Sequence, residues 1–104
     1  MRGWSEDTVL SSDVSSAGDP AIAADSAGNI YVAWITSGLL RLRKRLATGE
    51  WLPADTLQIQ PRDNAVSLAI DHCGNRHLVW ARYGMGYYGR VCYVRHSGTG
   101  WEPD

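Results

Sequence analysis

The sequence contains no phenylalanine, only four prolines and two cysteines, and no apolar run long enough to cross a membrane. A spanning helix needs ~20 consecutive apolar residues, so we expect no membrane partner. Ten basic and eleven acidic residues give a net charge of −1, which removes the electrostatic reason to expect nucleic acid as a partner. Residues 1–20 lack the basic start and apolar core of a signal peptide. The compartment stays open, with the cytoplasm preferred.

The chain also lacks sustained helical periodicity and a cysteine pattern typical of a disulfide framework. Cys73 falls in a predicted turn and Cys92 in a later strand, so we interpret both as unpaired thiols. Five tryptophans and five tyrosines supply the aromatic bulk in place of phenylalanine. With 44% hydrophobic residues, the composition is typical of a soluble globular domain.

What the sequence does contain is a repeat. Asp25–Trp34 (DSAGNIYVAW) returns 46 positions later as Asp71–Trp80 (DHCGNRHLVW), with Asp, Gly, Asn and Trp at matching places. A second marker, a tryptophan after Gly or Glu, occurs at Trp4, Trp51 and Trp101. Two markers with one period predict a repeating unit of short strands, and a period of about 40–50 residues is typical of propeller blades.

The strand pattern is the same in both copies. In the first copy we expect strands at 21–24, 30–35 and 39–46, followed by a less regular strand from Trp51 to Ile59. In the strand at 30–35 both alternating faces are apolar, which predicts burial between sheets. The Asp–x–x–Gly–Asn segments at 25–29 and 71–75 predict tight turns capped by the aspartate. The fold class is all-β.

The repeat resembles the blades of sialidase-like and BNR-type β-propellers, which commonly carry phrases such as DSxGNxxVxW followed by GW. It departs from the strict Asp-box pattern SxDxGxTW, because Asp25 and Gly28 are three positions apart and no Thr precedes Trp34. The resemblance implies two four-stranded antiparallel blades. The positions that match it are expected to be scaffold: Asp25, Gly28, Asn29, Trp34, Asp71, Gly74, Asn75 and Trp80.

Two blades cannot close a ring, since propellers typically have 4–8. We therefore expect one unit of two repeats, approximately 4–50 and 51–101, which completes a ring by homo-oligomerisation. A trimer is the first expectation and a tetramer the second. The strand around Trp4 is expected to complete the blade of a neighbour, because residues 101–104 are too few for a full outer strand.

Function is expected where the two copies differ, and one such place is the strand 40–45 (LRLRKR). A period of two places Arg41, Arg43 and Arg45 on one face, where three guanidinium groups could hold a carboxylate, sulfate or phosphate. The alternative is that they lie on a solvated outer strand or pair with acids of a neighbouring blade.

The other difference is a longer loop at 83–89 in the second copy. Tyr83, Tyr87 and Tyr88 stand there among glycines, a composition that suits stacking against a sugar or a peptide. The alternative is a hairpin whose tyrosines pack over the edge of the blade. Together with the three arginines, these tyrosines form our candidate ligand-binding set.

No cofactor or metal is expected. Among His72, Cys73 and His77, the side chains of Cys73 and His77 are expected to leave the turn in different directions, and no further Cys or His cluster completes four ligands. Asp25 with Asn29 offers too few oxygens for calcium. No catalytic motif is recognised. We expect a self-assembling, non-catalytic binding module with glycan as the first ligand. The alternatives are a sialidase-like glycoside hydrolase with sites at subunit boundaries, dependent on an acid such as Asp63 or Asp71, and a structural fragment without a ligand.

Overall fold

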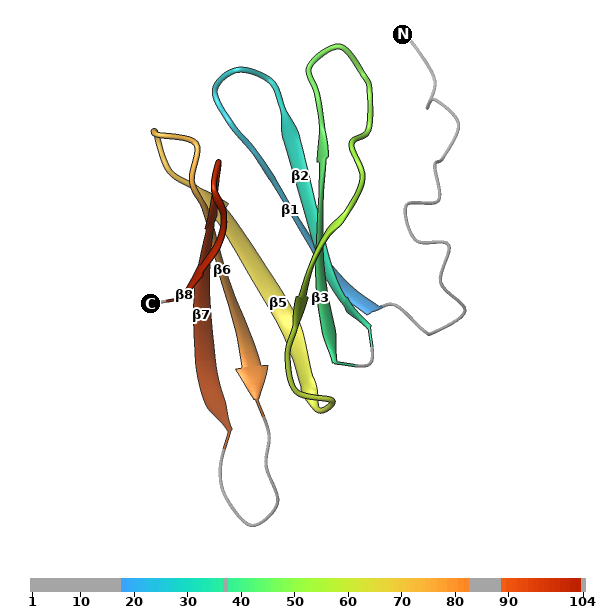
Figure 1. Cartoon of the computed structure of the whole chain (residues 1–104), viewed down its shortest axis with the longest axis vertical. Helices are drawn as coiled ribbons and strands as arrows, with labels where there is room; N and C mark the ends of the chain where they lie inside the picture. The colour runs from blue at the N-terminus through green and yellow to red at the C-terminus, as the bar shows by residue number, and fades with distance from the viewer. Residues whose placement is uncertain (1–17, 37, 83–88, 104) are drawn as a thin grey trace, which may run out of the picture.

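A computed structural model describes residues 18–36, 38–82 and 89–103 of the chain, which form two four-stranded antiparallel sheets (Figure 1). The first sheet contains β1 (Gly18–Ala24), β2 (Ile30–Thr36), β3 (Leu39–Arg45) and β4 (Asp55–Gln58). The second contains β5 (Asp63–Ile70), β6 (Arg76–Arg82), β7 (Arg90–Ser97) and β8 (Gly100–Pro103). Within the described residues there is no helix long and apolar enough to span a membrane. The expected all-β class is confirmed.

In both sheets the strands follow one another in chain order, so each sheet is a simple meander. The first strands lie toward the centre of the molecule, with β5 packed beside β1 and β2 (Figure 1). The register also repeats: β1 shifts against β2 between Gly18 and Ala21, and β5 shifts against β6 between Asn64 and Ser67, 46 positions later. Each shift is a bulge, which adds a residue and bends the strand.

The predicted turns between the first two strands of each sheet are present and are closed by aspartate. Asp25 Oδ1 accepts hydrogen bonds from the backbone N–H groups of Ala27 (2.9 Å) and Asn29 (3.0 Å), and Oδ2 accepts one from Asn29 Nδ2 (3.0 Å). Asp71 makes the equivalent three contacts in the second turn. Gly28 has φ +90°, a backbone conformation that favours glycine. The repeat thus encodes a turn, as expected.

The hydrophobic core lies between the two sheets. We call the face that each sheet turns toward the other its inner face, and the opposite one its outer face. β2 was expected to be buried between sheets on both faces, but only Tyr31, Ala33 and Ile35 lie on the inner face, and Ile30 and Val32 on the outer face are half-buried. The buried core residues are Tyr31, Ala33, Ile35, Leu40, Leu42, Ile59, Val66, Leu78, Trp80 and Val94. Burial of this apolar surface is the main force that holds the sheets together.

The sheets divide the chain at a different place from the one that the tryptophan markers predicted. The boundary lies between Gln58 and Asp63 rather than at residues 50–51, because β4 pairs with β3 and Trp51 bridges to Arg45. The segment after Trp51 therefore ends the first sheet and does not begin the second.

The second sheet already has a fourth strand. Residues 100–103 form β8, which pairs with β7 and is as long as β4. The premise that residues 101–104 are too few for an outer strand is therefore wrong. The region around Trp4, which was expected to supply that strand to a neighbour, lies outside the described residues.

The two repeated tryptophans are both buried, but their surroundings differ. Trp80 is 5% exposed and lies in the core between the sheets, where its Nε1 donates to the buried carboxylate Asp63 Oδ2 at 2.8 Å. Trp34 is 4% exposed and lies on the outer face of the first sheet, and its Nε1 has no acceptor among the described residues. Only Trp80 therefore lies between the two sheets.

This difference predicts how the two tryptophans respond to substitution. Trp34→Ala and Trp80→Ala should each lower the free energy of unfolding by about 3–5 kcal/mol through lost burial. Trp80→Phe should lower the free energy of unfolding by about 1–3 kcal/mol, because the buried carboxylate of Asp63 loses one of its hydrogen-bond donors. Trp34→Phe breaks no hydrogen bond and should lower it by less. Urea unfolding at one fixed protein concentration measures all four. Equal costs for the two Phe variants would contradict the assignment.

Candidate functional site: the pocket between the sheets

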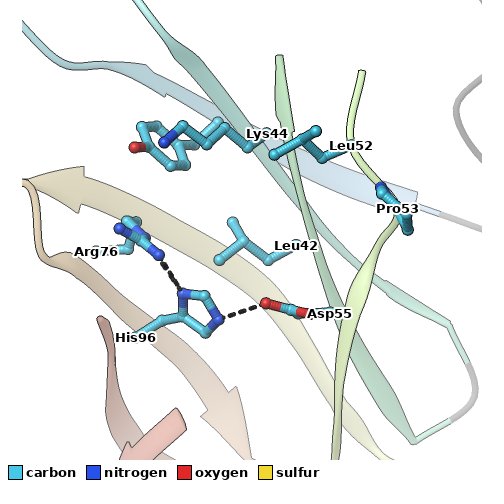
Figure 2. A pocket seen from close by; sticks show the side chains of 8 residues that line it. Leu42, Lys44, Leu52, Pro53, Asp55, Arg76 and His96 are labelled. Carbon is cyan, nitrogen blue, oxygen red and sulfur yellow. Dashed lines mark hydrogen bonds and ion pairs between the residues drawn. The ribbon is translucent and has the colours of Figure 1, made fainter. Parts of the chain in front are cut away.

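A pocket of about 210 Å³ opens at the junction of the two sheets, close to the β3–β4 connection. The first sheet and this connection contribute most of its lining, and the second sheet contributes Arg76 and His96 (Figure 2). The complete lining is Tyr31, Leu42, Lys44, Leu52, Pro53, Asp55, Arg76 and His96. Apolar and charged side chains therefore meet in one small space, which we take as the candidate site.

Three side chains form a hydrogen-bonded row across the junction. Asp55 Oδ2 of β4 lies 2.7 Å from His96 Nε2 of β7, and the other ring nitrogen of His96 faces Arg76 of β6 (Figure 2). Arg76 Nε and Nη2 lie 3.2 Å and 2.8 Å from His96 Nδ1. This row joins the first sheet to the second by polar contacts, beside the apolar core.

The row fixes the protonation state of His96. Arginine can only donate, so Nδ1 must accept, and the ring proton sits on Nε2, which donates to Asp55. Burial lowers the pKa of His96 below its ordinary value of 6.5, and the charge of Arg76 acts in the same direction. The Asp55 and Glu102 carboxylates oppose this shift without reversing it. His96 is therefore a neutral hydrogen-bond relay at pH 7.

Two cations flank the ring of Tyr31 in the pocket. Lys44 Nζ lies 5.4 Å from the ring centroid and Arg76 Cζ lies 5.0 Å from it, both within the range of a cation–π contact. Tyr31 is the fully buried neighbour of Lys44 across β2 and β3. Its hydroxyl donates to Asp25 Oδ2 at 3.1 Å, so the capped turn holds the ring in place.

The predicted arginine set has a definite place in the structure. Arg41, Arg43 and Arg45 share the outer face of the first sheet, as the period of two predicted, since each pairs with an outward residue of β2. Arg43 Cζ lies 5.5 Å from the Trp51 ring centroid, and its Nε donates to Leu52 O at 2.9 Å. These arginines face away from the pocket, and their role in ligand binding stays a prediction.

The other ligand candidates, Tyr83, Tyr87 and Tyr88, lie outside the described residues. His77 lies in β6, beside the turn that follows β5, and both of its ring nitrogens are engaged: Nε2 lies 2.8 Å from Asp71 Oδ2 in that turn and Nδ1 lies 2.7 Å from the Tyr93 hydroxyl. Cys73 is exposed and unpaired in the same turn, and Cys92 is also a free thiol. No group of three metal-ligating side chains occurs within the described ranges.

The two acids named for a hydrolase role are engaged in structural contacts. Asp63 is buried and accepts hydrogen bonds from Gln60 N, Trp80 Nε1 and two nitrogens of Arg82. Burial raises the pKa of Asp63, but these donors outweigh it and lower the pKa below its ordinary value. The hydrogen bond to His77 holds the pKa of Asp71 far below its usual range, with turn N–H groups adding to the effect. Carboxylates stabilised in this way are poor general acids.

Sequence reasoning missed the pocket residues. Asp55 and His96 stand 41 positions apart and meet only because β4 and β7 lie at the same junction. A signal was present, because position 76 is Arg in the second repeat and the equivalent position 30 is Ile in the first.

A comparison of the chain with protein-family models, with curated proteins and with solved structures found no match.

The lowered pKa of His96 predicts a pH dependence of stability. As the pH falls below 6.5, the unfolded chain binds a proton at His96 before the folded chain does, so the free energy of unfolding must fall. His96→Gln, which preserves a donor and an acceptor, should remove this part of the slope. Urea unfolding between pH 7 and about 5 measures it. His72→Gln, at an exposed turn position, is the control and should retain the wild-type slope.

Proposed function

We propose that this chain is a self-assembling partial β-propeller, in which each sheet is one blade and copies stack head to tail into a ring. The ring would act as a non-catalytic binding module. The observation that carries the proposal is that the two outer faces are the repeat equivalents of the two inner faces. Each copy therefore turns outward the repeat equivalents of the two surfaces that pack together inside it.

The equivalence follows from the strand register. Trp34 of the first sheet is equivalent to Trp80 of the second, and Trp80 belongs to the face that receives the first sheet. Conversely, Tyr31 and Leu42 on the inner face of the first sheet are equivalent to His77 and Tyr93 on the outer face of the second. An outer face of one copy and the opposite outer face of another thus correspond to the pair that packs within the chain.

The outer faces also expose large apolar side chains, which a monomer does not need on its surface. Ile22 on the first sheet is 69% exposed and Val91 on the second is 79% exposed, with Val79 and Tyr93 beside it on the same outer face. Large exposed apolar residues that share a face indicate an interaction surface. The occupant that the repeat supports is a second copy of this chain.

Contacts between two different faces are heterologous, and such contacts close into rings when the rotation between copies fits. Two blades per copy give rings of four, six or eight blades, all within the usual range for propellers. We favour six blades from a trimer and place eight from a tetramer second. The second sheet already holds β8, so this stacking requires no strand exchange by residues 1–10.

Glycan binding by the ring stays a proposal, and so does the alternative that the chain is a glycoside hydrolase. Among the described residues, Asp63 and Asp71 serve as hydrogen-bond acceptors within the scaffold, which does not favour hydrolysis. The arginines of the outer face would lie at the contact between copies.

The stacking proposal predicts a specific complementation. Ile22→Asp blocks the outer face of the first sheet and Val91→Asp blocks that of the second, so each variant alone should be a monomer because burying a carboxylate is costly. The wild type should have about three times the 11.5 kDa mass of one chain by light scattering. An equimolar mixture of the two variants should form dimers and nothing larger, since one intact pair of faces remains.

Thr48→Asp places the same charge in an exposed turn and should leave the ring unchanged. A monomeric wild type at micromolar concentration would overturn the proposal. Dimers formed by Val91→Asp alone would show that the contact joins two identical faces, which contradicts head-to-tail stacking.

A further inference from the structure

We propose that the pocket between the sheets binds a small hydroxycarboxylate. Lys44 and Arg76 would hold its carboxylate and Asp55 would accept a hydrogen bond from its hydroxyl. Every lining residue of the pocket comes from one copy of the chain. The proposal therefore goes beyond self-assembly and does not depend on it.

The charged side chains of the pocket have one positive charge in excess, which one bound anion would neutralise. The ammonium of Lys44 makes no hydrogen bond or ion pair with the described residues, and it lies over the ring of Tyr31, its paired residue on β2. Arg76 donates to His96, to Gly74 O and to Ser97 O, all of them neutral acceptors. With His96 neutral, Lys44 and Arg76 face the single carboxylate of Asp55. The pocket thus carries a net charge of +1, which suits a monoanion.

The repeat shows that this excess charge is a departure from the common pattern. In the second sheet the residue equivalent to Lys44 is Arg95, which forms an ion pair with Glu102 directly across the strands. In the first sheet the position opposite Lys44 is Leu52, whose N–H donates to Lys44 O at 2.9 Å. The acid that would neutralise the cation is therefore replaced by an apolar residue. The cation is left available to a ligand.

Arg76 is the second departure. The equivalent position in the first repeat is Ile30, so the guanidinium is specific to the second sheet. Its contacts with His96 and with two backbone carbonyls hold the planar group against Tyr31. Four of its five N–H groups are engaged in these contacts, so one N–H of Nη1 is available to a carboxylate, and the fixed group loses little side-chain entropy on binding.

The remaining lining sets the size and the polarity of the ligand. A volume of about 210 Å³ holds roughly seven waters at ~30 Å³ each, so the ligand is smaller than most drug-sized molecules. Leu42, Leu52 and Pro53 provide an apolar wall for C–H groups (Figure 2). Asp55 uses Oδ2 for His96, and Oδ1 accepts no hydrogen bond from the described residues. Asp55 would repel a dianion such as phosphate but accept a hydroxyl.

The test uses D-glucuronate as the probe, with D-glucose and acetate as partial matches. We expect glucuronate to bind in the millimolar range and to shift the backbone amide NMR signals of Tyr31, Lys44 and His96. Acetate should bind more weakly because it lacks the hydroxyls, and glucose should cause no shift. The titration is run on the wild type and on Val91→Asp, so that a failure of assembly does not obscure binding.

Two variants separate ligand binding from general charge effects. Lys44→Met removes the cation, and Leu52→Glu restores the acid found in the other repeat while it leaves Lys44 in place. Each should weaken glucuronate binding by about tenfold or more, because a charge-assisted contact is lost or already occupied. Arg62→Met removes a cation from an exposed turn and should change the dissociation constant less than about twofold.

Absence of any shift with glucuronate would overturn the proposal. So would binding that is unchanged in both Lys44→Met and Leu52→Glu, since the ligand would then lie elsewhere. Equal binding of glucose would contradict the carboxylate class.

Discussion

A four-stranded meander has two faces, and the burial of one of them against a second sheet is the constraint on which this structure depends. Tyr31, Leu42 and Trp80 are buried only because the two sheets face one another. Two sheets in one chain satisfy this requirement for two faces and leave two others turned outward. Because the sheets are copies of one repeat, the residues of each outward face occupy positions that are equivalent to those of an inner face in the other sheet. The outward faces also expose large apolar side chains. The proposed assembly with further copies would satisfy the same requirement that holds the single chain together.

The aspartates of the repeat show why the common residues of the two copies are a poor guide to chemistry. Asp25 accepts hydrogen bonds from two backbone N–H groups, from Asn29 Nδ2 and from the Tyr31 hydroxyl, and the side-chain bond from Asn29 contributes most to its lowered pKa. In the second turn His77 replaces Tyr31 as the donor to Asp71. The carboxylate oxygens of each aspartate accept the hydrogen bonds that close its turn. Chemistry is therefore left to positions at which the repeats differ, and most of the residues that line the pocket between the sheets are of this kind, among them Leu52 and Arg76.

Much of the fold could be predicted from the sequence, because strands and turns are local patterns that occur twice. The Asp–x–x–Gly–Asn turns, the alternation along β2 and the common face of Arg41, Arg43 and Arg45 all follow from short-range periodicity. The sheet boundary could not be predicted, since Trp51 marks the period equally well whether it ends one sheet or begins the next. The pocket could not be predicted because it needs partners from both sheets. The contact between Asp55 and His96 depends on how the two sheets pack against each other, and the periodicity of the sequence carries no information on that packing.

The outer face of the first sheet differs from its repeat equivalent in a manner that suits contact between copies. Where the second sheet has Cys92, Val94 and His96 in its interface, the first has Arg41, Arg43 and Arg45. Arginine is enriched in protein–protein interfaces because its planar group stacks on aromatic rings and pairs with carboxylates, as the contact of Arg43 with Trp51 illustrates. In the proposed ring, such a face would be hydrated when a copy is alone, whereas the apolar inner faces stay together. The junction within a chain is thus a permanent core, and the proposed junction between copies would be a surface that can form and separate.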